Sequence, residues 1–412
     1  MEQVLFLYLV TEGFPPTVFD SQVLEHVRLM ERYGVQFDLV VFERLLAFAK
    51  NRHRNARRAA EVRTAISGRL TQGVLATTFL GWDLWLPRLQ LQKILEQLGP
   101  LRRCLIHART QTAAALAVGL KRRHPGLRVV FDMRGDTVAE FLLNARESGS
   151  PVDSYFVRQK ATRLRAIEAS AVEGSDAMIC VCEAMKEAVL GRYPIEPGNI
   201  TVIPTVASPD RFYWDPALRA QVRQSLGWDE KFVLVYSGSL RAYQSANALG
   251  RLAAFLQAQM FPLHLLTVTP QVREAENVLT AQLPRDQFTV VSSSFNEMVR
   301  WLNAADAGCL LRDQDPVNHV AAPTKFAEYL LCGLPVILTS GIGDYSNLVE
   351  KESLGLVVGS LHDFGRLRLQ WTQLKEMADT CARSRIAAFG KQRFSSSVFA
   401  KTFLSLYERV LR

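Results

Sequence analysis

The stretch NHVAAPTKFAEYLLCGLPVILT, which runs from Asn318 to Thr339, is the part of this sequence that indicates its fold most directly. Pro323 is typical of the first position of a helix, and Gly333 is typical of the position just after a helix ends. The apolar residues 336–338 follow a second proline and indicate a short buried strand. The stretch therefore predicts a loop, one short helix and a strand of a parallel sheet.

At 100° per residue, Thr324, Lys325 and Glu328 lie on one arc of the predicted helix, and apolar side chains occupy the opposite arc. A helix N-terminus offers unpaired N–H groups and the positive end of the helix dipole, so Lys325 beside it makes a place that suits a phosphate. Glu328, one turn further on, can accept hydrogen bonds from sugar hydroxyls attached to that phosphate. The alternative is that Lys325 and Glu328 form an ordinary surface ion pair, which their spacing also allows.

Residues 323–336, PTKFAEYLLCGLPV, resemble the nucleotide-sugar-binding signature of family-four retaining glycosyltransferases. Enzymes of that family have the GT-B fold, so the resemblance implies an α/β chain with two facing Rossmann-like, doubly wound domains and an interdomain cleft. The implied N-terminal domain covers residues 1–205 and holds the acceptor, and the implied donor domain covers 206–390. The last helix, within 391–412, would cross back to the first domain.

Glu328 matches the residue that holds the donor ribose in this family, the second Glu of a motif in which seven residues separate two Glu. The first Glu would fall at position 320, and this chain has Val320 there. The resemblance therefore leaves the sugar or phosphate contact of the missing Glu to another polar side chain. The candidates are Lys325, Thr324 and His319.

A second donor motif follows the predicted strand 232–236, where the chain reads SGSLR. A glycine after a strand lets the backbone approach a phosphate closely, but a single glycine in that place is common. Together with the helix, the turn resembles the family's second donor-phosphate loop, which places Gly238, Ser239 and Arg241 at the diphosphate. The Lys-Gly pair that usually follows is absent, so Lys325 is left as the lysine available.

Polar side chains lie at the C-terminal ends of two predicted strands of the first domain. His107 and Arg109 follow one strand. Asp132 and Arg134 follow the next. Because the C-terminal ends of parallel strands meet at one edge of a sheet, these four side chains are expected to form one site. The alternative is that Asp132 and Arg134 simply pair with each other.

The motifs around these residues, IHART and FDMRG, resemble acceptor-side motifs of a subset of these glycosyltransferases. The resemblance implies catalytic or substrate-orienting roles for the four polar residues just named. Many relatives carry a second His where Arg109 stands. The resemblance also implies acceptor contacts from Gly13, Phe14 and Glu140.

A length of 412 residues is too great for one ordinary core and suits two domains of about 200 residues each. No apolar run reaches the roughly 18 residues that a membrane-spanning helix needs. The apolar run 4–10 follows Glu2 and has the pattern of a buried strand rather than of a signal peptide. The six cysteines are scattered, and the close pair Cys180 and Cys182 lacks nearby histidines, so reduced thiols are expected rather than a metal site.

A formal net charge of +9 indicates an acidic partner. Between Arg44 and Arg69 there are eight Lys or Arg residues and a single acidic residue, Glu61, interleaved with apolar side chains. The pattern predicts one or two basic amphipathic helices, which are either a solvated face or a surface that attracts anionic lipid headgroups. Nucleic acid is disfavoured, since no zinc finger, aromatic RNA-binding motif or helix-turn-helix accompanies the charge.

These features together predict a retaining glycosyltransferase that moves a sugar from a nucleoside diphosphate to an acceptor hydroxyl. The departing diphosphate gains negative charge, and no bound Mg²⁺ is expected to meet it. Arg241, Lys325 and helix N-termini are left to do so, each such donor being worth about 3 kcal/mol. No metal and no cofactor is expected beyond the nucleotide sugar, and no carboxylate pair of the glycosidase kind is evident.

Two other functions share this architecture: a nucleotide-sugar epimerase, and a non-catalytic subunit that only binds a nucleotide sugar. A dinucleotide oxidoreductase is disfavoured, because no Gly-x-Gly-x-x-Gly turn follows a predicted strand. The basic segment, together with the resemblance to the family, implies that the acceptor is a saccharide or a lipid-linked saccharide. The expected pathway is cell-envelope, exopolysaccharide or glycolipid biosynthesis. The expected location is the cytoplasm, with peripheral binding at the inner face of the membrane.

Overall fold

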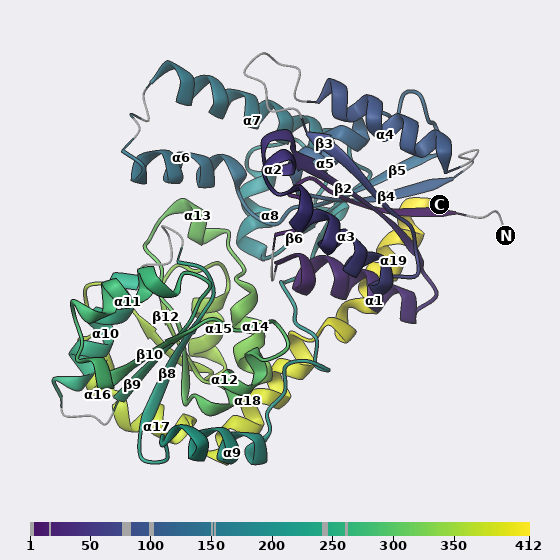
Figure 1. Cartoon of the computed structure of the whole chain (residues 1–412). Helices are drawn as coiled ribbons and strands as arrows, with labels where there is room; N and C mark the ends of the chain where they lie inside the picture. Colours follow the sequence, from purple (N-terminus) through teal and green to yellow (C-terminus); the bar gives the residue numbers. More distant parts are fainter. Residues whose placement is uncertain are drawn as a thin grey trace. The chain divides into compact units, whose positions relative to one another are not determined.

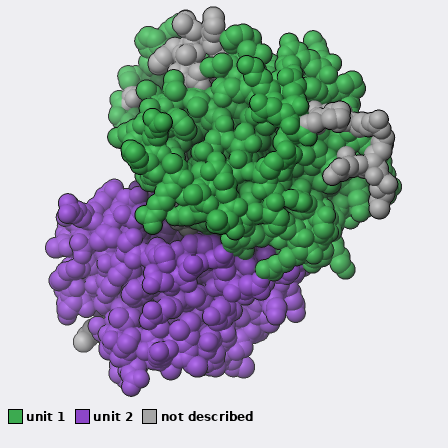
Figure 2. Space-filling model, turned by 45° about the vertical axis from the view of Figure 1, so that its right-hand side comes forward, with its two compact units in different colours: residues 1–203, 399–412 green, residues 204–398 purple. Residues whose placement is uncertain are grey.

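The chain forms two compact units (Figure 1, Figure 2). Unit 1 consists of residues 1–203 and 399–412, and unit 2 of residues 204–398. The sequence suggested boundaries after residues 205 and 390. The computed structural model describes residues 4–15, 18–75, 84–98, 103–149, 151, 154–240, 246–259 and 263–412.

Unit 1 is built on a seven-stranded parallel sheet in the order β3-β2-β1-β4-β5-β6-β7. The chain starts in the middle of this sheet, builds one half outward, and returns to build the other half from β4. This reversal between β1 and β4 is typical of a doubly wound, Rossmann-like sheet. The strands are β1 (Leu5–Val10), β2 (Phe37–Arg44), β3 (Leu70–Leu75), β4 (Cys104–Arg109), β5 (Leu127–Asp132), β6 (Ala177–Cys180) and β7 (Ile200–Val202).

Helices cover both faces of this sheet. One core unites the strands with α1 (Glu25–Arg32), α3 (Arg52–Ala65) and the last helix, α19 (Ser396–Leu411). The basic segment, expected as one or two helices, forms two: α3 and the short α2 before it. The other helices are α2 (Leu45–Lys50), α4 (Trp85–Gln97), α5 (Thr110–Val118), α6 (Thr137–Glu147), α7 (Tyr155–Gly174) and α8 (Glu183–Leu190).

Unit 2 is built on a six-stranded parallel sheet in the order β10-β9-β8-β11-β12-β13. The direction of winding reverses between β8 and β11, so this sheet also has a doubly wound topology. The strands are β8 (Phe232–Ser237), β9 (Leu263–Val268), β10 (Phe288–Val291), β11 (Ala307–Leu310), β12 (Val336–Thr339) and β13 (Gly355–Val358).

The helices of unit 2 bury both faces of its sheet. One apolar core packs the strands against helices α10, α11 and α17. The helices are α9 (Pro216–Leu226), α10 (Ala246–Gln257), α11 (Val272–Thr280), α12 (Met298–Ala304), α13 (Pro316–His319), α14 (Thr324–Leu331), α15 (Tyr345–Lys351), α16 (Gly365–Leu369), α17 (Trp371–Met377) and α18 (Thr380–Arg393).

Helix α14 and strand β12 are the helix and strand expected from the stretch 318–339. Pro323 is the N-cap rather than the first helical residue, because its ψ of 129° is extended. The helix ends in a Schellman motif: Gly333 donates its N–H to Leu330 and Leu334 donates to Tyr329, both at 2.9 Å. Gly333 has a φ of +71°, which glycine adopts without strain.

A buried hydroxyl group of the last helix forms hydrogen bonds within unit 1. Phe403, Leu406 and Tyr407 of α19 lie in the core of this unit. The Tyr407 hydroxyl lies 2.8 Å from Nδ1 of His107 on β4 and 2.9 Å from Nε2 of His26 on α1. Since all three side chains are buried, this hydroxyl satisfies two polar atoms that have no access to water.

We expect Tyr407→Phe to destabilise unit 1. The substitution leaves two buried imidazole nitrogens without a partner, at a cost of about 1–3 kcal/mol for each buried polar group. Thermal or urea unfolding of the purified protein measures the loss. Tyr33→Phe is the matched control, because Tyr33 is exposed at the end of α1. Equal stability of the two variants would show that the hydroxyl does not hold the helix in place.

Candidate functional site

Three neighbouring strands of unit 2, β8, β11 and β12, end at one edge of the sheet, and α14 begins there. The chain reaches this edge at Ser237, at Arg312 and at Thr339. The Arg312 N–H donates to Thr339 Oγ1 at 2.9 Å, which joins the ends of β11 and β12. Ser237 donates its N–H to the hydroxyl of Tyr329 on α14 at 2.9 Å, which joins the end of β8 to the helix.

Lys325 lies on the first turn of α14 with its ammonium group over an aromatic ring. Nζ is 4.1 Å from the centroid of Tyr236 on β8, a distance at which the ring face attracts a cation. The pKa of Lys325 is lowered to about 7, chiefly by burial and then by repulsion from Arg312, while Glu328 acts in the opposite direction. A lysine whose charge is this poorly stabilised becomes fully charged when an anion binds beside it.

Glu328 lies one turn further along α14 and is only 8% exposed. Burial raises the pKa of its carboxyl group to about 7, although the positive charge of Lys325 favours the ionised form. An ordinary surface ion pair between the two does not fit this burial. Strongly shifted groups of this kind cluster at functional sites.

The other expected donor residues lie at the same edge or outside the described residues. Thr324 is half-buried as the first residue of α14. Gly238, with a φ of +129°, follows β8 and donates its N–H to Val268. Ser239 accepts a hydrogen bond from the Tyr236 hydroxyl at 2.6 Å. Arg241 falls within the stretch 241–245, which the structure does not describe.

Arg312 is a basic residue at this edge that the sequence reasoning missed. Its side chain is buried, and Nη1 donates to Asn318 Oδ1 at 3.0 Å. A charged residue directly after an apolar strand was the available signal. Val320, which stands where the family has its first Glu, is buried, and His319 is exposed with its ring against Gly341.

The four polar residues expected at the strand ends of unit 1 do lie together. Neighbouring strands β4 and β5 place Arg109 beside Asp132, and His107 two residues earlier on β4. His107 Nε2 is 3.2 Å from Asp132 Oδ2, which also lies 2.7 Å from Arg134 Nη2. The pairing of Asp132 with Arg134, stated above as the alternative, is therefore present, and His107 belongs to the same network.

His107 and Asp132 are fully buried in this network. Burial lowers the pKa of His107, and the hydrogen bond to Asp132 only partly offsets that effect. Burial alone would raise the pKa of Asp132, but Arg134 and His107 hold it well below its usual range. The structure thus contains a neutral imidazole beside a carboxylate, and the carboxylate shares its charge with Arg134.

Arg109 points to the loop after β1 rather than into that network. Its Nε donates to Glu12 Oε2 at 3.0 Å, and its buried Nη1 has no hydrogen-bond partner among the described residues. Thr110, the next residue, has a φ of +72°, which is strained for a β-branched side chain and is typical of functional sites. Glu12 is a second residue that the sequence reasoning missed.

The acceptor-side residues expected from the resemblance lie around the same edge of unit 1. Gly13 has a φ of +70° and donates its N–H to Phe42 at the end of β2. Phe14 stacks edge-on against Phe19, with ring centroids 5.0 Å apart. Glu140 lies on α6 with its carboxylate over Gly135, where a Cβ would meet Oε1 at 2.6 Å.

Two family models match non-overlapping parts of the chain. The model described as Glycosyltransferase Family 4 matches residues 21–211, most of unit 1. The model described as the C-terminal domain of glucosyltransferase 3-like proteins matches residues 313–402, which include α14 with Lys325 and Glu328.

The chain is a glycosyltransferase, and its residues 21–211 match the family-four model.

Solved structures resemble this glycosyltransferase over almost its whole length. Sucrose-phosphate synthase from Thermosynechococcus elongatus has a TM-score of 0.70 at 16% identity, and the match covers 98% of this chain and 99% of that one. HepE of Anabaena, solved with UDP-glucose, has a TM-score of 0.69 at 17% identity, with 98% and 99% covered. At such identities the likeness shows the fold, and the enzyme has the GT-B fold.

A third similar structure is WaaG, a glycosyltransferase involved in lipopolysaccharide biosynthesis. Its TM-score is 0.61 at 16% identity, and the match covers 99% of this chain and 98% of that one. A search of curated proteins returned no match to the enzyme.

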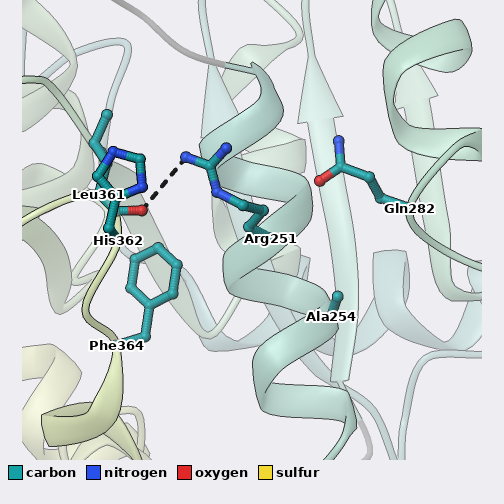
Figure 3. A pocket seen from close by; sticks show the side chains of 6 residues that line it. All are labelled: Arg251, Ala254, Gln282, Leu361, His362 and Phe364. Atoms are coloured by element: carbon teal, nitrogen blue, oxygen red, sulfur yellow. Dashed lines mark hydrogen bonds between the residues drawn. The ribbon is translucent and has the colours of Figure 1, made fainter.

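The described part of the glycosyltransferase contains two pockets that other residues line. One, of about 420 Å³, lies in unit 2 between Arg251 and Gln282 on one side and Leu361, His362 and Phe364 on the other (Figure 3). There the Arg251 guanidinium reaches toward the Leu361 carbonyl at 3.4 Å. The other, of about 590 Å³, lies between α6 and α7 in unit 1. None of the predicted site residues lines either pocket.

Neither a metal-ligand cluster nor a membrane span is present in the part of the chain that the structure describes. No three His, Cys, Asp or Glu side chains there are grouped as metal ligands. No helix there is long and apolar enough to cross a membrane.

The buried histidines predict loss of stability in acid. Burial lowers the pKa values of His26 and His107 below 6.5, so the unfolded chain binds protons that the folded enzyme does not. The free energy of unfolding should therefore fall as pH drops below about 6.5, by up to about 1.4 kcal/mol per pH unit for each histidine.

Urea unfolding between pH 8 and pH 5 measures this slope. His26→Gln should flatten it, and His53→Gln, at an exposed position of α3, should not. A slope that is the same in both variants would locate the acid sensitivity elsewhere.

Proposed function

We propose that this glycosyltransferase transfers a sugar from a nucleoside diphosphate sugar to an acceptor hydroxyl, with retention of configuration at the anomeric carbon. The observation that carries the proposal is the pair of half-buried Lys325 and buried Glu328 at the N-terminus of α14, where each has a pKa near 7. A diphosphate beside Lys325 would stabilise its positive charge, and ribose hydroxyls would provide Glu328 with hydrogen bonds that water does not supply. HepE, whose structure holds UDP-glucose, supports a nucleotide-sugar donor.

The proposed reaction takes place on one face of the sugar. The bond between the anomeric carbon and the diphosphate oxygen breaks, and its electron pair stays on that oxygen. The acceptor oxygen forms the new bond to the anomeric carbon from the same side, and its proton passes to the departing diphosphate oxygen. The protein's main task is then to stabilise negative charge on the leaving group, which preorganised N–H donors and cations do best.

We assign that task to Lys325, the N-terminus of α14 and Arg241, without a metal ion or a cofactor. Lys325 is held by Tyr236 and the backbone of α14, so it does not have to reorganise as the charge develops. Gly238, Ser239 and Thr324 lie at the same edge and provide backbone and hydroxyl groups for the phosphates. The missing first Glu, replaced by Val320, makes the sugar contact depend on these groups and His319.

On the acceptor side, we assign contact with substrate to Arg109, Arg134 and Glu140 and to the loop at Gly13 and Phe14. His107 and Asp132 are fully buried, so we assign them a role other than substrate contact. Their network holds the Arg134 guanidinium in place through Asp132, so we propose that they position the site rather than touch the acceptor.

We further propose that the acceptor is lipid-linked and that the enzyme docks on the cytoplasmic face of the membrane, in cell-envelope or exopolysaccharide synthesis. The exposed side chains of α2 and α3 support this. Leu45 is 50% and Leu46 76% exposed, and Arg52, Arg54 and Arg57 are exposed on the helix that follows. Apolar side chains beside basic ones are what an anionic membrane surface attracts.

Glu328→Gln should weaken donor binding by roughly tenfold or more, because a charged hydrogen-bond acceptor is lost. Lys325→Ala should lower turnover by about two orders of magnitude, the usual effect of removing one preorganised donor. Thermal stabilisation by UDP, GDP and ADP identifies the nucleotide, and rates are then measured with its sugars. Lys351→Ala, an exposed lysine at the end of α15, is the control.

The products of that assay separate the functions that share this architecture. Transfer or slow donor hydrolysis supports the proposal, and NMR of the product decides whether the anomeric configuration is retained. Epimerised donor would show an epimerase. Binding without turnover would show a subunit that only binds the nucleotide sugar. If Glu328→Gln and Lys325→Ala both keep the wild-type donor affinity and rate, neither residue belongs to the donor site.

For the membrane, we expect the protein to sediment with anionic but not with neutral vesicles, and salt to release it. Replacing Arg52, Arg54 and Arg57 with Gln should abolish sedimentation, since each basic residue near the surface contributes about 1 kcal/mol. Arg58 is left unchanged, because its guanidinium pairs with Asp20 and Glu61.

The control for the membrane experiment removes the same charge from exposed positions of unit 2. It replaces Arg366, Arg368 and Arg393 with Gln. Equal loss of sedimentation in both triple variants would show that vesicle binding depends on net charge and not on the basic segment. Equal binding to neutral and anionic vesicles, or to neither, would make the basic segment an ordinary solvated face.

A further inference from the structure

Arg312 lies at the same edge of the sheet of unit 2 as Lys325, but the reaction described above assigns it no role. It follows β11, which lies between β8 and β12 in the sheet. Lys325 lies over Tyr236 of β8, and the backbone of Arg312 bonds to Thr339 of β12. Arg312 therefore stands at the middle one of three strand ends that border the proposed donor site.

Hydrogen bonds hold Arg312 in one arrangement. Thr339 Oγ1 accepts from its N–H at 2.9 Å and donates back to its carbonyl at 2.7 Å. Asn318 accepts from Nη1 at 3.0 Å and is itself fixed, since its amide donates to the Asp313 carbonyl and its own carbonyl accepts from the Gly343 N–H. Asn318 is fully buried and uncharged, so it orients the guanidinium without cancelling its charge.

The position of Arg312 has an electrostatic cost in the protein alone. Arg312 and burial both oppose a charge on Lys325. Repulsion between two neighbouring cations is unfavourable, and a bound anion beside both of them would offset that cost. The N-terminus of α14 adds the positive end of its dipole to the same place.

We propose that Arg312 is a donor-phosphate-binding residue that holds the diphosphate together with Lys325 and the N-terminus of α14, and that Asn318 positions it. The inference rests on the proposed function, because it assigns a further residue to that site. It gives the chain a second described cation for the phosphates, in a region where the Lys-Gly pair usual in the family is missing.

An arginine suits this task better than a lysine would. The guanidinium carries five N–H donors in a planar fork, so it can bond to Asn318 and to two phosphate oxygens at once. Its charge is kept at every physiological pH, whereas Lys325 has a pKa near 7. Arg312 would hold the diphosphate before and after the sugar leaves, and Lys325 would gain its charge as the diphosphate binds.

The test compares a nucleoside diphosphate with its nucleoside. Whichever of UDP, GDP and ADP binds the wild-type enzyme is titrated by calorimetry, beside uridine, guanosine or adenosine. Arg312→Gln should weaken diphosphate binding about tenfold or more, as expected for a charge-assisted bond, and leave nucleoside binding unchanged. Arg312→Lys should recover part of the affinity. Arg368→Gln, at an exposed position of α16, is the control and should bind as the wild type does.

Asn318→Asp tests the positioning role through a double-mutant cycle. A carboxylate against Arg312 would compete with the phosphate for the guanidinium, so diphosphate affinity should fall in the Asn318→Asp variant. In an Arg312→Gln background the same substitution should have little further effect, because the group through which it acts is gone. A purely structural role for Asn318 would give the same loss in both backgrounds.

Three outcomes would overturn the inference in different ways. Unchanged diphosphate affinity in Arg312→Gln would remove Arg312 from the site and leave the proposed function intact. Equal loss of diphosphate and nucleoside binding, with a lowered melting temperature, would make Arg312 a structural residue. Failure of the wild-type enzyme to bind UDP, GDP or ADP would overturn the proposed function itself, and the role of Arg312 with it.

Discussion

The parallel direction of the strands is the constraint on which the rest of this molecule depends. In a parallel sheet all strands end at one edge, so residues far apart in the chain are brought together there. In unit 2, β8, β11 and β12 are neighbours in this way, and they unite residues 237, 312 and 339. The crossover from β11 to β12 also brings the N-terminus of α14 to that edge. No local signal in the sequence could assemble this set.

The two units differ in how well the protein stabilises their buried charged groups. In unit 1, Asp132 is surrounded by Arg134 and His107, and Tyr407 closes the network from the last helix. The charge of that carboxylate is stabilised within the protein through Oδ2, while its Oδ1 is buried without a hydrogen-bond partner among the described residues. In unit 2, half-buried Lys325 and buried Glu328 have pKa values near 7, so the folded state does not stabilise their charges well. Poorly stabilised charge at a strand end is the stronger sign of a ligand.

Local signals explain which features could be predicted from the sequence. Helix α14 and strand β12 follow from Pro323, Gly333 and the apolar run after them, all within one short stretch. The apolar face of α19 is likewise a local periodicity, and Phe403 and Leu406 do pack in the core of unit 1. The burial of His107 could not be predicted, because it depends on Tyr407, which lies 300 residues further along the chain. Arg312 follows an apolar run, which is a local signal, but its contacts are set by strand order and could not be predicted.

The replacement of the family's first Glu by Val320 fits this physical picture. Val320 is buried at the end of α13, so the position serves packing and has no polar group to offer. A Glu there would add a negative charge to the segment that binds Arg312 through Asn318, and would partly offset the positive charge that we propose for the diphosphate. Two residues earlier, Asn318 provides a neutral oxygen to Arg312 instead. With Arg312 and Lys325 as its described cations, the site keeps more positive charge for the leaving group when position 320 is apolar.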